Sequence, residues 1–190
     1  MSITLRPNPD FPLPHGVSLQ ILGRPDRELF VEHLLHLDAT ARHDRFNGGI
    51  NDEALADYAD RCLSPGVLVI AAMQDGKVIG VAELHPVKPQ TAEVAFSVSD
   101  GQRGRGIGAA LFALILEAAW SRGLWAIEIS THSDNEAMKS LARQFGAELH
   151  FSGNDTSGLI HLDQIRFEET AVDAGPRPVR KPKAETAAVK

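Results

Sequence analysis

The sequence predicts a mixed α/β fold in which helices cover a mostly antiparallel sheet that contains one β-α-β crossover. Runs that alternate apolar and polar residues, as half-buried strands do, are interleaved with runs of helical period. One glycine-rich loop, Gly101 to Gly108, joins such a strand to a long apolar helix, and another strand follows, which is the order of a parallel crossover. The 190 residues are enough for one domain with a sizeable core.

The first half of the chain should form a strand, two helices and a hairpin. Pro25 is typical of a helix start and Asn51 of a helix cap, and each precedes apolar residues at helical spacing. Gly76 can supply the positive φ of a tight turn, so the strands on either side of it should pair antiparallel. These strands are expected at residues 17–22, 67–73 and 77–84.

The second half should form the crossover and end in two strands. Because residues 92–98 alternate in polarity, Glu93 should face away from Phe96. The residues that follow the glycine-rich loop are apolar on nearly every side, as in a helix packed deeply against a sheet. Strands are expected at residues 92–98, 124–130, 147–151 and 159–167, and helices at residues 107–122 and after a cap at Ser133 or Asp134.

Composition divides the chain into three parts. Residues 1–16 carry four prolines, which remove backbone donors, so they should form an irregular arm. Residues 17–167 hold all of the periodic runs and should form the folded domain. Residues 168–190 are rich in alanine, proline and charge without an apolar period, and we expect a disordered tail.

Charge and residue usage exclude several classes of protein. A net charge of -6 opposes binding of the whole protein to nucleic acid. No apolar run is long enough to cross a bilayer, and the first residues lack the zones of a secretory signal, so we expect a cytoplasmic protein with no membrane contact. Cys62 has no partner for a disulfide, and the eight histidines show no ligand spacing, so we expect no metal.

The loop from Gly101 to Gly108 is the part of the sequence that points to chemistry. It contains four glycines and two arginines, and the apolar helix begins directly after it. Glycines allow successive backbone N–H groups to converge on one ligand, and a helix N-terminus adds a positive dipole. A P-loop would also need a lysine followed by a hydroxyl, and a dinucleotide loop would follow the first strand with a different glycine spacing. The loop therefore predicts an anion site of another kind.

Two motifs in register resemble those of the GNAT superfamily of acyl-CoA N-acyltransferases. Arg103-Gly104-Arg105-Gly106-Ile107-Gly108 is similar to the Gln/Arg-x-x-Gly-x-Gly/Ala signature of that family. Asn135, Met138, Leu141 and Gly146 resemble its helix after the next strand. The resemblance implies a three-layer fold with acetyl-CoA as co-substrate. The residues that it implies for cofactor binding are Phe96, Val98, Arg103, Gly104, Arg105, Gly106, Ile107, Gly108, Ala109, Asn135 and Met138.

A narrower resemblance concerns the bacterial Pat-type protein-lysine acetyltransferases. Residues 92–96, followed by Asp100 and Gln102, resemble the acetyltransferase domain of that group, whose glutamate in this strand is the catalytic base. The resemblance thus implies Glu93 as the base for an amine that attacks the thioester directly in a ternary complex. Arg45 and Phe46 resemble the segment near the acceptor site.

One departure from the family leaves an alternative open. Many members have a tyrosine seven residues after the helix asparagine, which protonates the departing thiolate, and this chain has Ala142 there. Glu93 favours an N-acetyltransferase, while the missing tyrosine leaves open a non-catalytic module that binds CoA for regulation or interaction. The acceptor that the resemblance implies is an amine-bearing small molecule or a protein lysine, and a homodimer is also left open.

Overall fold

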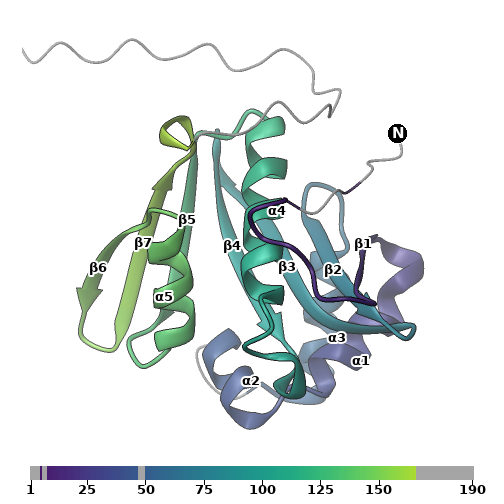
Figure 1. Ribbon diagram of the computed structural model, residues 1–190. Coiled ribbons are helices and arrows are strands. Elements are labelled where there is room, and N and C mark those ends of the chain that lie inside the picture. The colour runs from purple at the N-terminus through teal and green to yellow at the C-terminus, as the bar shows by residue number, and fades with distance from the viewer. Residues whose placement is uncertain (1–4, 6–7, 47–49, 166–190) are drawn as a thin grey trace, which may run out of the picture.

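A computed structural model of the protein describes residues 5, 8–46 and 50–165, and it contains one seven-stranded sheet (Figure 1). The strand order is β1-β2-β3-β4-β5-β7-β6, and only β4 and β5 pair in parallel. The strands are β1 (Ser18–Leu22), β2 (Leu68–Gln74), β3 (Lys77–Lys88), β4 (Thr91–Val98), β5 (Ala126–His132), β6 (Glu148–Ser152) and β7 (Asp155–His161). The predicted mixed sheet with one crossover is confirmed.

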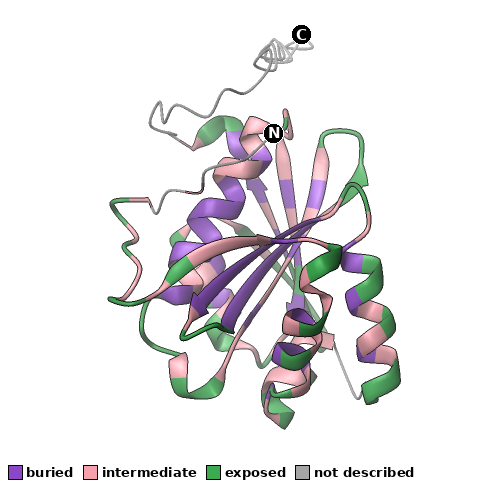
Figure 2. Ribbon diagram, turned by 90° about the vertical axis from the view of Figure 1, so that its right-hand side faces the viewer, coloured by how far each residue is buried: buried purple, intermediate pink, exposed green. Residues whose placement is uncertain are grey.

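Helices cover both faces of this sheet, which gives three layers (Figures 1 and 2). One face packs against α4, and the other packs against α1 and α3, so the protein has two apolar cores. The helices are α1 (Arg27–Leu35), α2 (Ala39–Phe46), α3 (Asp52–Cys62), α4 (Ile107–Ser121) and α5 (Glu136–Gln144). Within the described residues, none of the helices is both long and apolar enough to cross a bilayer.

The predicted alternation of β4 is confirmed by its neighbours. Val94 is buried among the residues that pack against α4, and Phe96 and Val98 lie against the same core. The intervening side chains face α1 and α2, where Ser97 bonds His33. Glu93 therefore faces away from Phe96, on the same side of the sheet as His85, which pairs with it across β3 and β4.

A gap opens in the sheet where its two parallel strands diverge. β4 and β5 pair only from Thr91 to Glu93, opposite Ala126 to Glu128, and they separate beyond that point (Figure 1). The start of α4 lies close to the sheet here, since a Cβ on Gly80 of β3 would come within 3.0 Å of the Ile107 side chain. The strands therefore open next to the beginning of α4.

Three expectations about the elements were wrong. The helix α2 was not predicted, because none of its residues is buried and it shows no apolar stripe. The cap of α5 is Asn135, whose Oδ1 accepts from the Met138 N–H at 2.9 Å, and neither Ser133 nor Asp134 takes this role. The last strand covers residues 155–161 instead of 159–167, because its outward-facing residues are polar.

The expected division into arm, domain and tail is only partly described. Residues 8–16 form turns and bends with no helix or strand, and β1 begins at Ser18. The predicted tail at residues 168–190 lies outside the described residues. The three-part division therefore stays a prediction.

Candidate active site

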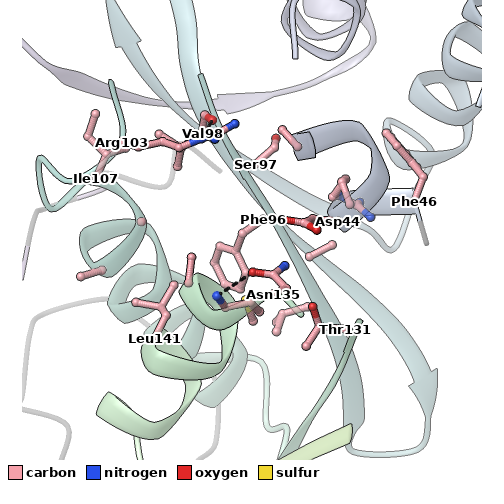
Figure 3. A pocket seen from close by; sticks show the side chains of 18 of the residues that line it. Asp44, Phe46, Phe96, Ser97, Val98, Arg103, Ile107, Thr131, Asn135 and Leu141 are labelled. Carbon is pink, nitrogen blue, oxygen red and sulfur yellow. Dashed lines mark hydrogen bonds between the residues drawn. The ribbon is translucent and has the colours of Figure 1, made fainter. Parts of the chain in front are cut away.

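A cavity of about 740 Å³ fills the gap between β4 and β5 (Figure 3). The N-terminal ends of α4 and α5 line one side of it, and α2 lines the other. Figure 3 shows Arg103 and Ile107 at one end of the cavity, and Asp44 and Phe46 at the other. We call the first the loop end and the second the α2 end, and they differ in how they are built.

Backbone groups form the loop end. Gly104 and Gly106 have φ values of 70° and 83°, a region that glycine adopts without strain, and a Cβ added to either would meet nothing within 4 Å. The first hydrogen bond of α4 joins Ala110 N–H to Gly106 C=O at 3.0 Å. The N–H groups of the three preceding residues therefore have no acceptor within the helix, and these residues line the cavity. Such an arrangement can bind an anion.

Two exposed arginines flank these backbone groups. Arg103 donates to Asp38, and this ion pair is accessible, with 41% and 34% of the two side chains exposed. Arg105 donates to Gln102, lies outside the cavity lining and is also exposed. Exposed ion pairs contribute about 0–1 kcal/mol, so Arg103 can exchange Asp38 for another anion at little cost.

Side chains at the α2 end cluster around Glu83, which is buried and lies outside the cavity lining. The Glu83 side chain is 0% exposed and accepts from Arg45 Nη2 at 2.8 Å through Oε1. Its Oε2 accepts from the Tyr58 hydroxyl, from the Cys62 thiol at 3.2 Å and from His85 Nε2 at 3.0 Å. Burial would raise the pKa of Glu83, but the Arg45 charge and these hydrogen bonds outweigh it and hold that pKa well below its usual range.

The same contacts decide between a hydrogen-bonded cluster and a metal centre. Cys62, Glu83 and His85 bring three ligand atoms within 4.8 Å of one another. However, the Arg45 guanidinium already neutralises the carboxylate, and burial raises the pKa of the Cys62 thiol, which opposes the thiolate that a metal requires. The residues fit a hydrogen-bonded carboxylate better than a metal site.

Glu93 is the carboxylate whose setting differs from that of its neighbours. It lines the cavity, is half-buried and has no hydrogen-bond or ion-pair partner among the described residues. Glu128, opposite it on β5, is paired with Lys88 at 2.7 Å. Glu83 is committed to its cluster, and Asp100 is 78% exposed on a turn outside the lining. Of these four acids, Glu93 has the setting that a base acting inside the cavity requires. Asp44 on α2 is a second carboxylate that lines the cavity without such a partner among the described residues.

Hydroxyl groups in the lining were not predicted as site residues. Ser97 donates to His33 Nε2 at 2.8 Å, because His33 Nδ1–H donates to the Val78 carbonyl at 3.2 Å. Burial lowers the pKa of His33 to about 4, so the ring is neutral. Thr131 Oγ1 is buried without a partner among the described residues. Ala142, which stands where many family members have tyrosine, is buried outside the lining.

The cavity brings together nearly all of the residues that the sequence singled out. Arg105 is the exception, because it lies outside the lining. Phe96 is part of the lining, and its ring stacks on that of Phe112 with 4.7 Å between the centroids. Asp44 also lines the cavity and was not predicted as a site residue, because no local motif marks it. His85 lines it as well and bonds Glu83, a buried carboxylate outside the lining. The predicted residues in the lining are Arg45, Phe46, Glu93, Phe96, Val98, Arg103, Gly104, Gly106, Ile107, Gly108, Ala109, Asn135 and Met138.

The sequence matches known proteins over the same region. Residues 33–147, more than half of the chain, match the acetyltransferase (GNAT) family. The L-2,4-diaminobutyric acid acetyltransferase of Nocardia farcinica is 36% identical over 92 residues, which cover 45% of this chain and 47% of that protein. The L-methionine sulfoximine/L-methionine sulfone acetyltransferase of Pseudomonas aeruginosa is 31% identical over 87 residues, 43% of this chain and 51% of that protein. The matched residues thus span about half the length of these curated relatives.

Solved structures agree with the fold. The GNAT domain of S. lividans PAT superimposes with a TM-score of 0.68 at 19% identity, over 75% of this chain and 89% of that one. A putative acetyltransferase from Salmonella typhimurium, solved with acetyl-CoA, gives a TM-score of 0.59 at 16% identity, over 83% and 98%. At these identities the likeness concerns the fold.

Proposed function

The chain belongs to the acetyltransferase (GNAT) family, and from this premise we propose that it is an acetyl-CoA-dependent N-acetyltransferase with Glu93 as its catalytic base. The observation that carries the proposal is a single cavity with free backbone donors at one end and an unpartnered carboxylate further along it. Bound acetyl-CoA would supply an acetyl group activated as a thioester.

The loop end fits a diphosphate. The open space above Gly104 and Gly106 admits an anion to the backbone, and the N–H groups of Ile107, Gly108 and Ala109 are available as donors. Arg103 adds positive charge once it exchanges Asp38 for a phosphate oxygen. We assign the remaining contacts to Val98 and Phe96 on β4 and to Asn135 and Met138 on α5, on either side of the gap.

The α2 end would handle the amine. An ammonium group must lose a proton before its nitrogen can attack, and Glu93 is placed to accept that proton directly or through a water molecule. The amine nitrogen then forms a bond to the acetyl carbon while the carbon–sulfur bond breaks. Backbone N–H groups near Phe96 and Val98 would stabilise charge on the carbonyl oxygen. The products are an amide, the CoA thiol and one proton.

The curated relatives and the motif around Glu93 suggest two classes of acceptor. The curated relatives described above are named for amino-acid derivatives. The motif around Glu93 resembles the Pat-type protein-lysine enzymes. We therefore propose a primary amine as the acceptor, on a small molecule or on a lysine side chain.

A second function is supported by one observation. Ala142 replaces the expected tyrosine and is buried outside the lining, and the Tyr58 hydroxyl is committed to Glu83. A protein that bound CoA without turnover would need no general acid. The two functions differ in whether Glu93 affects a reaction rate.

The test measures acetyl transfer by the full chain and compares the wild type with Glu93→Gln and Glu128→Gln. Release of the CoA thiol is measured against a panel of amines, amino acids and lysine peptides, and CoA affinity is measured by calorimetry. Loss of a general base typically lowers turnover about 10²–10⁴-fold, which we expect for Glu93→Gln with CoA affinity unchanged. Glu128→Gln should retain turnover, because that residue pairs with Lys88 instead of lining the cavity.

Two results would contradict the proposal in different ways. Equal turnover in wild type and Glu93→Gln removes Glu93 as the base but leaves the enzyme. CoA binding without transfer to any amine favours the non-catalytic module.

A further inference from the structure

The α2 end of the cavity carries an unbalanced negative charge. Among the described residues, the cavity lining contains four charged side chains: Asp44, Arg45, Glu93 and Arg103. Of these, Arg103 lies at the loop end. Arg45 is therefore the one permanent cation of the lining at the α2 end. Whether an acceptor's carboxylate can bind there depends on whether Arg45 is free.

Arg45 is not free. Its guanidinium lies 2.8 Å from the carboxylate of Glu83, and the exposed fractions of the two side chains are 11% and 0%. Withdrawing Arg45 would leave Glu83 buried without its counter-charge, which is strongly unfavourable. The guanidinium also lies 5.1 Å from the ring centroids of Phe46 and Tyr58. Arg45 is thus held on Glu83, and an acceptor carboxylate gains little from it.

The two remaining carboxylates have no such partner. Asp44 and Glu93 line the cavity from α2 and from β4, and neither forms an ion pair or hydrogen bond within the described part of the chain. His85, the nearby titratable ring, donates through Nε2 to Glu83 and so belongs to the neutralised cluster. Tyr58 also donates to Glu83. Two negative charges therefore remain for a ligand.

We propose that the acceptor is a small aliphatic diamine or polyamine without a carboxyl group. One ammonium group would lose its proton to Glu93 and be acetylated, and the second would remain charged beside Asp44. This inference rests on the proposed function and adds the acceptor's class to it. It separates this chain from relatives whose names specify amino-acid derivatives with a carboxylate.

Matched small molecules test the proposal. 1,3-Diaminopropane is L-2,4-diaminobutyric acid without its carboxyl group, and propylamine is 1,3-diaminopropane without its second amine. We measure kcat/KM for acetyl transfer by the full chain to these three and to a lysine-containing peptide. Charge pairing at a half-exposed site predicts that 1,3-diaminopropane exceeds propylamine about tenfold, and that the carboxyl group brings no gain.

Variants assign the preference to one residue. Asp44→Asn should lower the ratio of kcat/KM for 1,3-diaminopropane to that for propylamine about tenfold, because the second ammonium loses its partner. Asp57→Asn is the matched control, since Asp57 is an exposed carboxylate on α3 outside the lining, and it should leave the ratio unchanged.

The outcomes separate this inference from the proposed function. A tenfold preference for L-2,4-diaminobutyric acid or for the lysine peptide over 1,3-diaminopropane would overturn the inference and keep the enzyme. An unchanged ratio in Asp44→Asn would do the same. CoA binding with no transfer to any amine would overturn both.

Discussion

The two ends of the cavity differ in how their charged groups are held: one has an exposed ion pair and the other a buried one. At the loop end, the donors are backbone N–H groups and Arg103 forms an exposed ion pair with Asp38. At the α2 end, Arg45 forms a buried ion pair with Glu83, and Tyr58, Cys62 and His85 complete the cluster. An exposed pair exchanges partners readily, whereas a buried pair does not.

This difference fits the two tasks that we propose. A diphosphate can take Arg103 from Asp38 because water stabilises the carboxylate that is left behind. The Arg45–Glu83 pair instead fixes α2, which has no buried apolar residue, against β3. The loop end can thus adapt to its ligand, while the α2 end acts as a rigid wall.

Gly106→Glu should have the largest effect and acts at the loop end. A carboxylate would enter the anion site, and φ at this position is 83°, so we expect CoA affinity to fall at least about a thousandfold. Calorimetry with CoA measures this. Gly123→Glu is the control, because Gly123 has a φ of 77° with nothing within 4 Å of an added Cβ but lies at the far end of α4. Comparable loss of binding in both variants would assign the effect to backbone strain.

Glu83→Gln should have the second-largest effect, and it acts at the α2 end. It leaves the Arg45 guanidinium buried without a counter-charge, which typically costs about 3–5 kcal/mol of unfolding free energy. Chemical denaturation at pH 7 measures this loss. Asp60→Asn, which removes the exposed partner of Arg27, should cost less than about 1 kcal/mol. If the two variants cost the same, the distinction between buried and exposed pairs fails.

His33, which bonds Ser97 of the cavity lining, should make stability depend on pH. Its pKa in the folded protein, about 4, lies below the ordinary histidine value of 6.5, so the unfolded chain binds more protons between these values. The neutral ring is therefore favourable above pH 6.5, and its contribution is lost as pH falls toward 4. We expect a loss of about 2–3 kcal/mol over this range, measured by denaturation at several pH values. The pH dependence should be weaker in His33→Gln, and an unchanged profile would exclude His33 as its origin.

Asp38→Asn should have the smallest effect and tests exchange at the loop end. It removes the anion that competes for Arg103, so CoA affinity should rise about two- to fivefold at low salt. The gain should shrink at high salt and be absent for a pantetheine thioester, which lacks the diphosphate. An equal gain for that thioester would show that Asp38 acts on the cavity in another way.

The same contrast explains what could be predicted from sequence. The loop end is a local feature, in which glycine spacing and the apolar helix that follows determine where the N–H groups point. Asn135, which caps α5, was found by its position in a motif that left both helix capping and a cofactor contact open, although Ser133 or Asp134 was expected as the cap. The residues that the sequence assigned to this end line the cavity, except Arg105, and their role in binding stays a prediction.

The α2 end could not be predicted in the same way. Glu83, Tyr58 and His85 come together only once β3 and α3 have packed, and no spacing along the chain connects them. The helix α2 was missed because it has no apolar stripe. Polar contacts, such as the one from Arg45 to Glu83, attach it to the rest of the fold. Three-dimensional packing, rather than local pattern, determines this end.

The central claim is that free N–H groups at the start of α4 bind a diphosphate. A crystal structure of the full chain with CoA tests it most directly. We predict diphosphate oxygens within hydrogen-bond distance of the Ile107, Gly108 and Ala109 nitrogens, with the thiol arm running along β4 toward Glu93. A diphosphate bound elsewhere, with these nitrogens facing solvent, would contradict the account.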